Sequence, residues 1–217
     1  MQRITIIPLV ILILSGILPV AYASYQTSIV YSDLQQTRFP YWNYIDVFDK
    51  RYNACIITIT PHEMTFNASV EDIYDFSIIL NSENSTTSGK ALRVSFHKSG
   101  TLDIIYQTGG EEGSYITIGS GTWANDTSVE IILYRGLINV KSNNTIVVED
   151  FAFDEPLYAL FTYSSTETTL TGGYVNVSVR PYGAIDVTPV INAYIPVIVC
   201  LALLAASLSF LKKLGKW

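Results

Sequence analysis

The stretch Leu92-Arg-Val-Ser-Phe-His97, the turn Lys98-Ser-Gly100 and Thr101-Leu-Asp-Ile-Ile-Tyr106 together decide the fold class. Leu92, Val94 and Phe96 alternate with polar residues, and apolar residues alternate again after the turn. A period of two residues is typical of half-buried strands, and a short Gly-containing connection is typical of a hairpin. This stretch therefore predicts two antiparallel strands that share one face towards a core.

The same alternation continues through the body of the chain, and no run has a helical period. More than ten short strands in one domain favour an all-β fold, namely a two-sheet antiparallel β-sandwich or jelly roll. The expected core residues are Leu92, Val94, Phe96, Leu102, Ile104, Val175, Val177 and Val179. Further strands are expected at 54–60, 64–70, 75–81, 128–135, 137–141, 145–151 and 157–163.

The N-terminus has the pattern of a secretory signal peptide. A basic residue, Arg3, precedes the apolar run Ile4–Val20, which closes on Ala21-Tyr-Ala23. A charged start, an apolar core and a small-residue site are the three parts of such a peptide. We therefore expect residues 1–23 to be removed; the alternative is an N-terminal anchor that is not cleaved.

The C-terminus predicts one transmembrane helix at 194–211. This run carries no charge, its 18 residues suit a hydrocarbon core, and Lys212, Lys213 and Lys216 follow it. The expected order is a β-sandwich ectodomain at 24–181, a stalk at 182–193, the helix, and a cytoplasmic tail at 212–217. The protein would then lie in the cell membrane with one span and its ectodomain outside. A buried C-terminal helix is the alternative.

The charge distribution agrees with this arrangement. The 217 residues carry 13 Lys and Arg against 19 Asp and Glu, a net charge of −6. Without Arg3 and the three C-terminal lysines, nine basic residues face nineteen acidic ones, so the body carries −10. Such a surface repels nucleic acid and anionic glycans, which leaves a neutral glycan or another surface protein as the expected partner. Two cysteines exclude a disulfide framework.

Five Asn-x-Ser/Thr sequons support an exterior location and predict a glycoprotein. In the run 64–70, alternation places Met64 and Phe66 on the apolar face and Asn67 on the polar face. The same argument turns Asn176 outward, and the other three sequons fall in expected loops. The predicted glycosylation sites are Asn67, Asn84, Asn125, Asn143 and Asn176.

The order of strands and turns resembles a known fold. Val129-Glu-Ile-Ile-Leu-Tyr-Arg-Gly-Leu-Ile-Asn-Val-Lys141 is similar to consecutive hairpins of concanavalin A-like (laminin-G-like) jelly rolls, and Leu157–Tyr163 and Gly172–Val179 are similar to their closing strands. The resemblance covers roughly 75–180. It implies a domain that binds a sugar or a protein, and more rarely a glycosidase. No functional residue of that family matches a position here.

Residues that could carry catalysis are sparse. Retaining glycosidases need two carboxylates about 5 Å apart, whereas Asp150 and Asp154 would lie near 13 Å apart along one strand. A solvated strand end explains them better. His62 and His97 lack the spaced partners of a metal site, and the turn Asn125–Asp126 could hold calcium but is explained by turn propensity. We therefore expect no catalytic residues, no metal, no cofactor and no enzymatic activity.

Aromatic residues are the strongest candidates for ligand binding. The stretch Phe39–Tyr44 contains Tyr41, Trp42 and Tyr44, and Tyr115 and Trp123 flank glycine-rich segments. Exposed rings of this kind stack on sugar faces or anchor protein partners, although core packing is the alternative. The leading hypothesis is a membrane-anchored surface glycoprotein whose β-sandwich binds a glycan or a protein, or builds a cell-envelope or virion surface layer. The alternative is an ectoglycosidase on the same fold.

Overall fold

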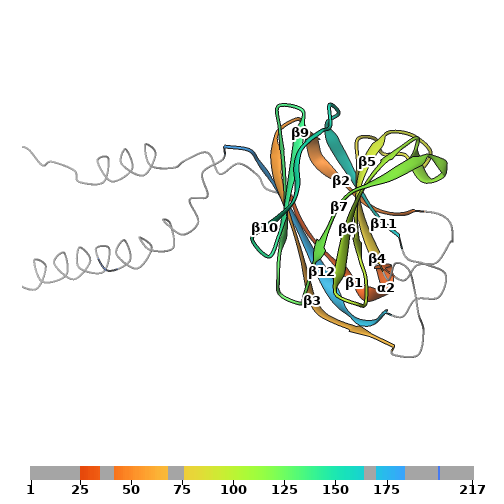
Figure 1. Cartoon of the computed structure of the whole chain (residues 1–217), viewed down its shortest axis with the longest axis vertical. Helices are drawn as coiled ribbons and strands as arrows, with labels where there is room; N and C mark the ends of the chain where they lie inside the picture. The colour runs from red at the N-terminus through yellow and green to blue at the C-terminus, as the bar shows by residue number, and fades with distance from the viewer. Residues whose placement is uncertain (1–24, 35–41, 68–75, 164–169, 184–199, 201–217) are drawn as a thin grey trace, which may run out of the picture. The chain divides into compact units, whose positions relative to one another are not determined.

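The computed structural model describes residues 25–34, 42–67, 76–163, 170–183 and 200. The body, residues 23–183, forms one compact unit built almost entirely of strands (Figure 1). The expected all-β antiparallel sandwich is confirmed. Among the described residues no helix has the length and apolarity to span a membrane. The predicted signal peptide and the predicted span, apart from Cys200, lie outside the described residues.

The strands form two six-stranded antiparallel sheets. Sheet I has the order β1-β12-β3-β8-β9-β10, and sheet II has the order β2-β11-β4-β5-β6-β7. The strands of sheet I are β1 (Tyr25–Val30), β12 (Leu170–Pro181), β3 (Cys55–Phe66), β8 (Val129–Tyr134), β9 (Leu137–Ser142) and β10 (Thr145–Ala152). The strands of sheet II are β2 (Asn43–Tyr52), β11 (Leu157–Tyr163), β4 (Phe76–Asn81), β5 (Lys90–Phe96), β6 (Thr101–Thr108) and β7 (Ser114–Thr122). Two short helices, α2 (Tyr31–Leu34) and η1 (Gly110–Glu112), complete the body.

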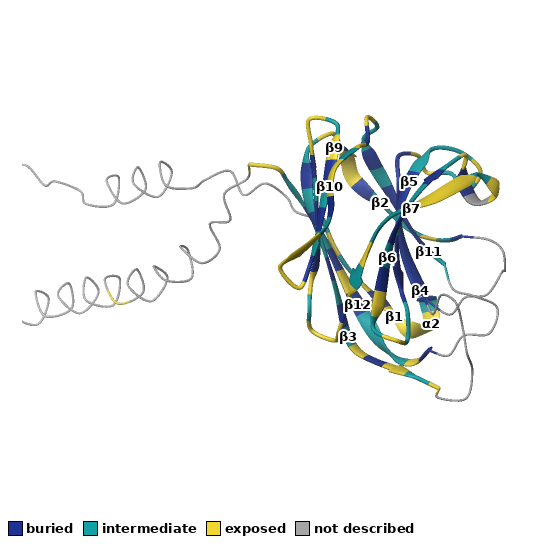
Figure 2. Ribbon diagram, in the orientation of Figure 1, coloured by how far each residue is buried: buried dark blue, intermediate teal, exposed yellow. Residues whose placement is uncertain are grey.

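The core lies between the two sheets, where the buried residues of both form one continuous layer (Figure 2). All eight residues that alternation assigned to the core are buried. The hairpins have the expected turns: Arg135 and Gly136 both have positive φ between β8 and β9, as do Asn143 and Asn144 between β9 and β10. Two successive residues with positive φ match the twist of tight antiparallel hairpins.

The long strand β3 differs from its prediction. Two separate strands were expected at 54–60 and 64–70, yet Cys55–Phe66 is continuous. Pro61 lacks an N–H group, which would disrupt a central strand. Here β8 pairs with β3 only as far as Ile59, so Pro61 lies beyond that ladder and its carbonyl accepts a hydrogen bond from the Asp126 N–H at 2.8 Å.

The free edges of the two sheets meet in two places. Between β7 and β10, a Cβ atom on Gly119 would lie 2.4 Å from the Val147 carbonyl oxygen, so only glycine permits this approach. At the opposite edges, the Tyr25 hydroxyl of β1 donates to Asp46 of β2 at 3.0 Å. Burial, and then this hydrogen bond, raise the pKa of Tyr25. The β7 and β10 edges therefore pack closely against each other, whereas β1 and β2 are joined by a side-chain hydrogen bond.

Candidate functional site

Of the aromatic stretch 39–44, Asn43 and Tyr44 belong to β2 of sheet II. Tyr41 lies outside the described residues, and Asn43 begins β2. Trp42 is only 5% exposed, and its ring packs against Phe161 with 5.7 Å between centroids. Trp42 is therefore a core residue and not the exposed ring that was expected to contact a ligand.

Trp123 is also a core residue. Its ring meets those of Phe66, Phe76 and Phe96 edge to face, and its indole N–H donates to the His97 carbonyl at 2.8 Å. A buried tryptophan whose N–H is satisfied in this way stabilises the fold. Trp123 is therefore removed from the candidate binding residues.

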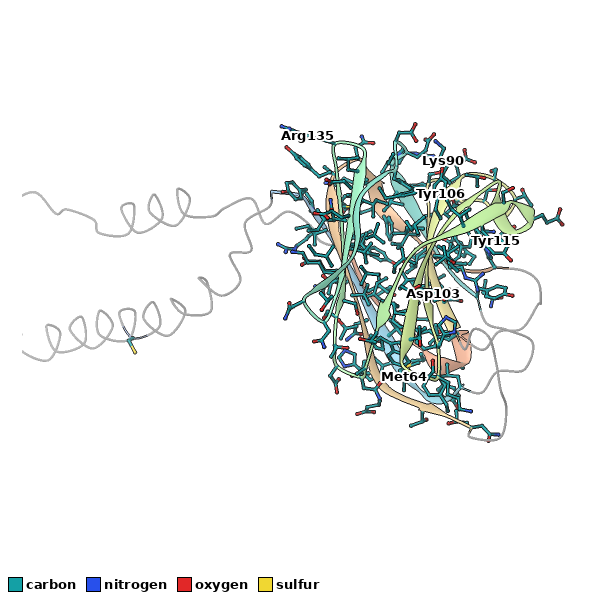
Figure 3. The ribbon with its side chains drawn as sticks, in the orientation of Figure 1. Met64, Lys90, Asp103, Tyr106, Tyr115 and Arg135 are labelled. Carbon is teal, nitrogen blue, oxygen red and sulfur yellow. The ribbon has the colours of Figure 1, made fainter. Side chains whose placement is uncertain are left out.

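Tyr44 and Tyr115 are exposed, at 52% and 65%, but they do not form one site. Tyr44 lies on β2 and Tyr115 on β7, the two edge strands of sheet II. Five strand spacings of ~4.8 Å separate these strands by roughly 24 Å. Figure 3 shows Tyr115 on the side of the sandwich opposite Arg135.

Much of the outer face of sheet II, between these two edge strands, is buried and is not open to a ligand. Trp42, Ile79, Ala91, Ala159 and Phe161 form a second buried apolar cluster there. Beside this cluster is a polar row, in which the Arg93 Nε–H donates to Ser77 at 3.0 Å and to Ser95 at 3.1 Å. The Arg93 guanidinium lies 4.2 Å from the centroid of the Tyr163 ring. These groups are arranged to stabilise the sheet.

The polar row ends in a cluster around Asp103. The His97 Nε2 atom lies 3.0 Å from one carboxylate oxygen, and the Ser120 hydroxyl donates to the other at 2.5 Å. In nucleophilic catalysis the serine contacts the histidine, whereas here the carboxylate separates them. The contacts described here involve one carboxylate, that of Asp103, whereas a glycosidase needs a pair.

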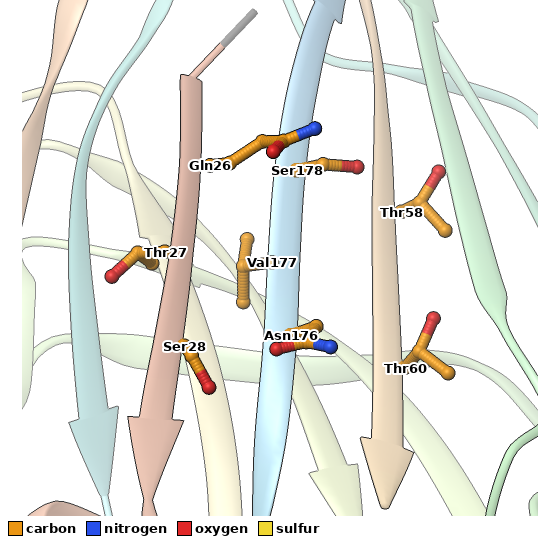
Figure 4. Close-up of a pocket in the computed structure, with 8 residues that line it drawn as sticks. All are labelled: Gln26, Thr27, Ser28, Thr58, Thr60, Asn176, Val177 and Ser178. Carbon is orange, nitrogen blue, oxygen red and sulfur yellow. The ribbon is translucent and has the colours of Figure 1, made fainter.

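The outer face of sheet I is open and hollowed. A groove of about 440 Å³, which we call the Asn176 groove, runs over β1, β12 and β3 (Figure 4). Figure 4 shows hydroxyl and amide side chains from all three strands along it. It is lined by Gln26, Thr27, Ser28, Thr58, Thr60, Asn176, Val177 and Ser178.

A second pocket of about 430 Å³, the Tyr134 pocket, lies on the same face over β8, β9 and β10. The rings of Tyr134 and Tyr182 stack at 4.3 Å between centroids, and the Arg135 guanidinium lies 5.0 Å from the Tyr134 ring. Four of the nine large hydrophobic side chains exposed among the described residues line it. The complete lining is Ile132, Tyr134, Arg135, Leu137, Asn139, Lys141, Ile146, Asp150 and Tyr182.

Polar groups are fixed within the Tyr134 pocket. The Asn139 amide donates to Asp150 at 3.2 Å, and the Asp150 N–H donates to the Asn139 side-chain oxygen at 3.0 Å. Asp150 has a φ of 49° at a register shift of β10, which removes it from the regular alternation. The pocket therefore combines stacked aromatic rings, apolar walls and hydrogen-bonding groups of both kinds.

Sequence reasoning did not find this pocket. Tyr134 and Tyr182 lie 48 positions apart, and Tyr182 was assigned to the stalk, although its N–H donates to the Ala54 carbonyl at 3.1 Å. One signal was present: Ile132 and Tyr134 are apolar residues at the outward positions of β8, where alternation expects polar ones. Two such residues on a solvent face indicate a contact surface.

The remaining candidates are placed as follows. Asn67, Asn84, Asn125, Asn143 and Asn176 are all exposed, so each predicted sequon is at the surface. Burial raises the pKa of the Cys55 thiol to about 12, which keeps it protonated and unreactive at neutral pH. Within the described ranges, no three His, Cys, Asp or Glu side chains group as metal ligands.

No protein-family model matches the chain, and no curated protein matches it. Among solved structures, it is similar to LamAcat from Zobellia galactanivorans, with a TM-score of 0.45 and 9% identity over 73% of this chain and 77% of that one. A variant of human galectin-16 aligns with a TM-score of 0.37 and 10% identity over 61% of this chain and 97% of the galectin. A β-fructofuranosidase from Schwanniomyces occidentalis aligns with a TM-score of 0.49 and 14% identity over 75% of this chain and 34% of its own.

These similar structures include enzymes. Besides the β-fructofuranosidase, they include a glycosidic hydrolase and a family 18 polysaccharide lyase. The expectation that this chain is not an enzyme is contradicted by this finding and is not retained.

Proposed function

We propose that this chain is a membrane-anchored surface glycoprotein whose β-sandwich recognises a carbohydrate in the Tyr134 pocket. The observation that carries the proposal is the exposed, stacked pair Tyr134–Tyr182 beside the hydrogen-bonded pair Asn139–Asp150. The first pair offers an apolar platform, and the second offers fixed polar groups. A sugar ring, with an apolar face and a polar rim, needs both.

The chemistry of each wall suits a sugar ring. The C–H face of a pyranose can pack on a tyrosine ring, whose two side-chain torsions cost little entropy when fixed. The free carboxylate oxygen of Asp150 can accept from a sugar hydroxyl, while Lys141 and Arg135 can donate to one. Asp150 offsets only one of the two cations in the pocket, Arg135 and Lys141. The body as a whole carries −10, and this charge favours a neutral sugar over an anionic one.

The anchor and the exterior location are supported by sequence features that lie outside the β-sandwich. The leader at 1–23, the uncharged run at 194–211 and the lysines after it define one orientation. The surface positions of all five sequons agree with that orientation.

Cleavage of the bound glycan is a second candidate function. Asp150 favours it, because this carboxylate lines the pocket from a backbone position with positive φ, a conformation that is over-represented at functional sites. Asp150→Asn would keep the shape of the side chain and remove its charge. Loss of hydrolysis with binding retained would assign a catalytic role, which an assay for new reducing ends measures.

A glycan array probed with the full-length chain in detergent tests the main proposal. Tyr134→Ala should weaken binding about tenfold or more, because stacking on an aromatic ring contributes about 1–3 kcal/mol by analogy with nucleobases. Tyr115→Ala is the matched control, since Tyr115 is exposed on the other sheet. Loss of binding in Tyr115→Ala but not in Tyr134→Ala would place the site on sheet II and overturn the assignment.

A further inference from the structure

The asparagine side chains of two predicted sequons have different surroundings. The Asn176 side chain is exposed on the outer face of β12, in the groove shown in Figure 4. Asn125 lies in the connection between β7 and β8, and its side chain faces the backbone of β3. The Met64 N–H donates to the Asn125 Oδ1 atom at 2.8 Å, and the Asn125 Nδ2 atom donates to the Met64 carbonyl at 3.2 Å.

This two-point contact extends the ladder of β3. In an antiparallel sheet, two residues exchange both of their backbone hydrogen bonds. Pairing between β3 and β8 ends at Ile59, and the Asn125 amide supplies the same exchange further along the strand. Because the backbone offers one donor and one acceptor, the orientation of the amide is fixed: Oδ1 faces the N–H group and Nδ2 faces the carbonyl.

The rest of the connection is also fixed to β3. The Asp126 N–H donates to the Pro61 carbonyl at 2.8 Å, and Asp126 Oδ1 lies 2.6 Å from the His62 Nδ1 atom. The hydroxyl of Thr127, the third residue of the sequon, donates to the Ala124 carbonyl at 2.7 Å and accepts from the Ala124 N–H at 3.0 Å. The sequon is thus built into the structure at all three positions.

The stereochemistry of a glycosylated asparagine conflicts with this contact. A glycan converts the side chain into a secondary amide, which prefers the trans form by about 2.5 kcal/mol. In that form the sugar carbon lies on the same side as Oδ1, and the single remaining N–H points away from it. The side that now contacts Met64 would then carry the sugar instead of a donor.

We propose that Asn125 is a structural amide which excludes a glycan from the folded protein, whereas Asn176 accepts one. A chain modified at Asn125 loses the bond to the Met64 carbonyl and places a sugar against β3. Modification of Asn176 disturbs no pairing, because its side chain projects from the outer face into a groove lined by hydroxyl groups. The inference rests on the proposed export only in so far as export exposes the sequons to glycosylation.

Occupancy mapping in a eukaryotic secretory host tests the modification. The chain is expressed behind a heterologous secretion signal, and occupancy is read by peptide mass spectrometry after enzymatic deglycosylation in heavy-oxygen water. In the folded, protease-resistant fraction, occupancy at Asn125 should be at least tenfold lower than at Asn176. Equal occupancy of the two sites in that fraction would overturn the proposal.

Two matched variants test the structural role without any glycan. Asn125→Asp keeps the acceptor for the Met64 N–H but turns a carboxylate oxygen towards the Met64 carbonyl. In full-length protein from bacteria, it should raise the unfolding equilibrium constant roughly tenfold, as expected for loss of a hydrogen bond that leaves a partly buried carbonyl unsatisfied. Asn176→Asp should leave the constant unchanged, and equal stability of the two variants would contradict the proposal.

A parallel expression with the chain's own residues 1–23 separates this inference from the proposed export. Failure of that leader, with the occupancy pattern intact behind the heterologous signal, would refute export and retain the assignment of Asn125. Secretion by the native leader with a glycan on Asn125 in the folded fraction would support export and refute the assignment of Asn125 as a structural amide.

Discussion

The outer faces of the two sheets carry similar alternating sequences but differ in burial. On sheet II, Ser77 and Ser95 are fully buried beside the apolar cluster that contains Phe161. On sheet I, the corresponding outward positions line the Asn176 groove and the Tyr134 pocket. One face therefore works as a second core, and the other is free to contact a ligand. The difference shows that alternation determines which way a side chain points, but not what covers it.

The largest expected difference is in the stability lost when one aromatic residue is removed from each face. Phe161→Ala removes a ring that is 1% exposed and should lower the free energy of unfolding by about 3–5 kcal/mol. Tyr134→Ala, on the open face, should lower it by less than about 1 kcal/mol. Urea denaturation of the two variants measures both values, and similar losses would mean that the two faces are equally buried.

Trp42→Ala tests whether the aromatic stretch belongs to the buried face. The variant should lose about 3 kcal/mol of stability, because the Trp42 ring fills the cluster beside Phe161. The midpoint of thermal unfolding records the change. Unchanged stability together with weaker ligand binding would restore Trp42 as an exposed binding residue.

Arg93→Met tests the polar row of sheet II. The change removes the donor to Ser77 and Ser95, both fully buried, and should cost about 1–2 kcal/mol. Arg180→Met, on the outer face of sheet I, is the control. Its free energy of unfolding should stay within about 0.5 kcal/mol of that of the parent protein. If the two substitutions change the free energy of unfolding equally in chemical denaturation, the polar row has no structural role.

The smallest effect belongs to a surface pair at one end of the sandwich. Lys90 donates to Asp154 at 2.5 Å, and this hydrogen bond lowers the pKa of Asp154 and raises that of Lys90. The contribution of the pair is therefore present between the ordinary values of 3.8 and 10.5, and is lost as the pH falls through the lowered pKa of Asp154 or rises through the raised pKa of Lys90.

Lys90→Met should raise the pKa of Asp154 towards its ordinary value, because the hydrogen bond from Lys90 is the largest cause of the lowering, and NMR titration of the carboxyl carbon detects the change. The midpoint of urea unfolding at neutral pH should barely move, because exposed ion pairs contribute little. An unchanged pKa of Asp154 in the variant would show that Lys90 does not cause the shift.

The sequence predicted the hairpin of β5 and β6 and its inward residues, because Leu92–Phe96 and Leu102–Ile104 alternate cleanly. It did not predict β7, whose residues are mostly exposed and include two glycines, so no apolar period marks the strand. It did not predict β1 or β2 either, and it assigned Tyr44, near the start of β2, to ligand binding. Local pattern is weak in edge strands, where one side has no partner.

The candidate site escaped prediction for a different reason. Tyr134 and Tyr182 meet only because β8 and β12 both flank β3, a pairing that no local pattern records. Asn125 was recognised as a sequon, yet its contact with Met64 spans 61 positions and depends on where the β8 ladder ends. Sequons and strand faces are local features, whereas pockets are set by the order of strands in a sheet.

The closure of the sandwich at Gly119 limits how copies of the chain can assemble. An edge strand with free N–H and C=O groups is a template for the backbone of another molecule, and such pairing leads to fibres. Here β7 and β10 cover one another, and Tyr25 and Asp46 join β1 to β2. Edge-to-edge pairing with another copy is therefore disfavoured where β7 and β10 meet. A surface layer built from this protein would therefore be held by side chains of the outer faces, so its lattice could change through surface substitutions while the fold stays constant.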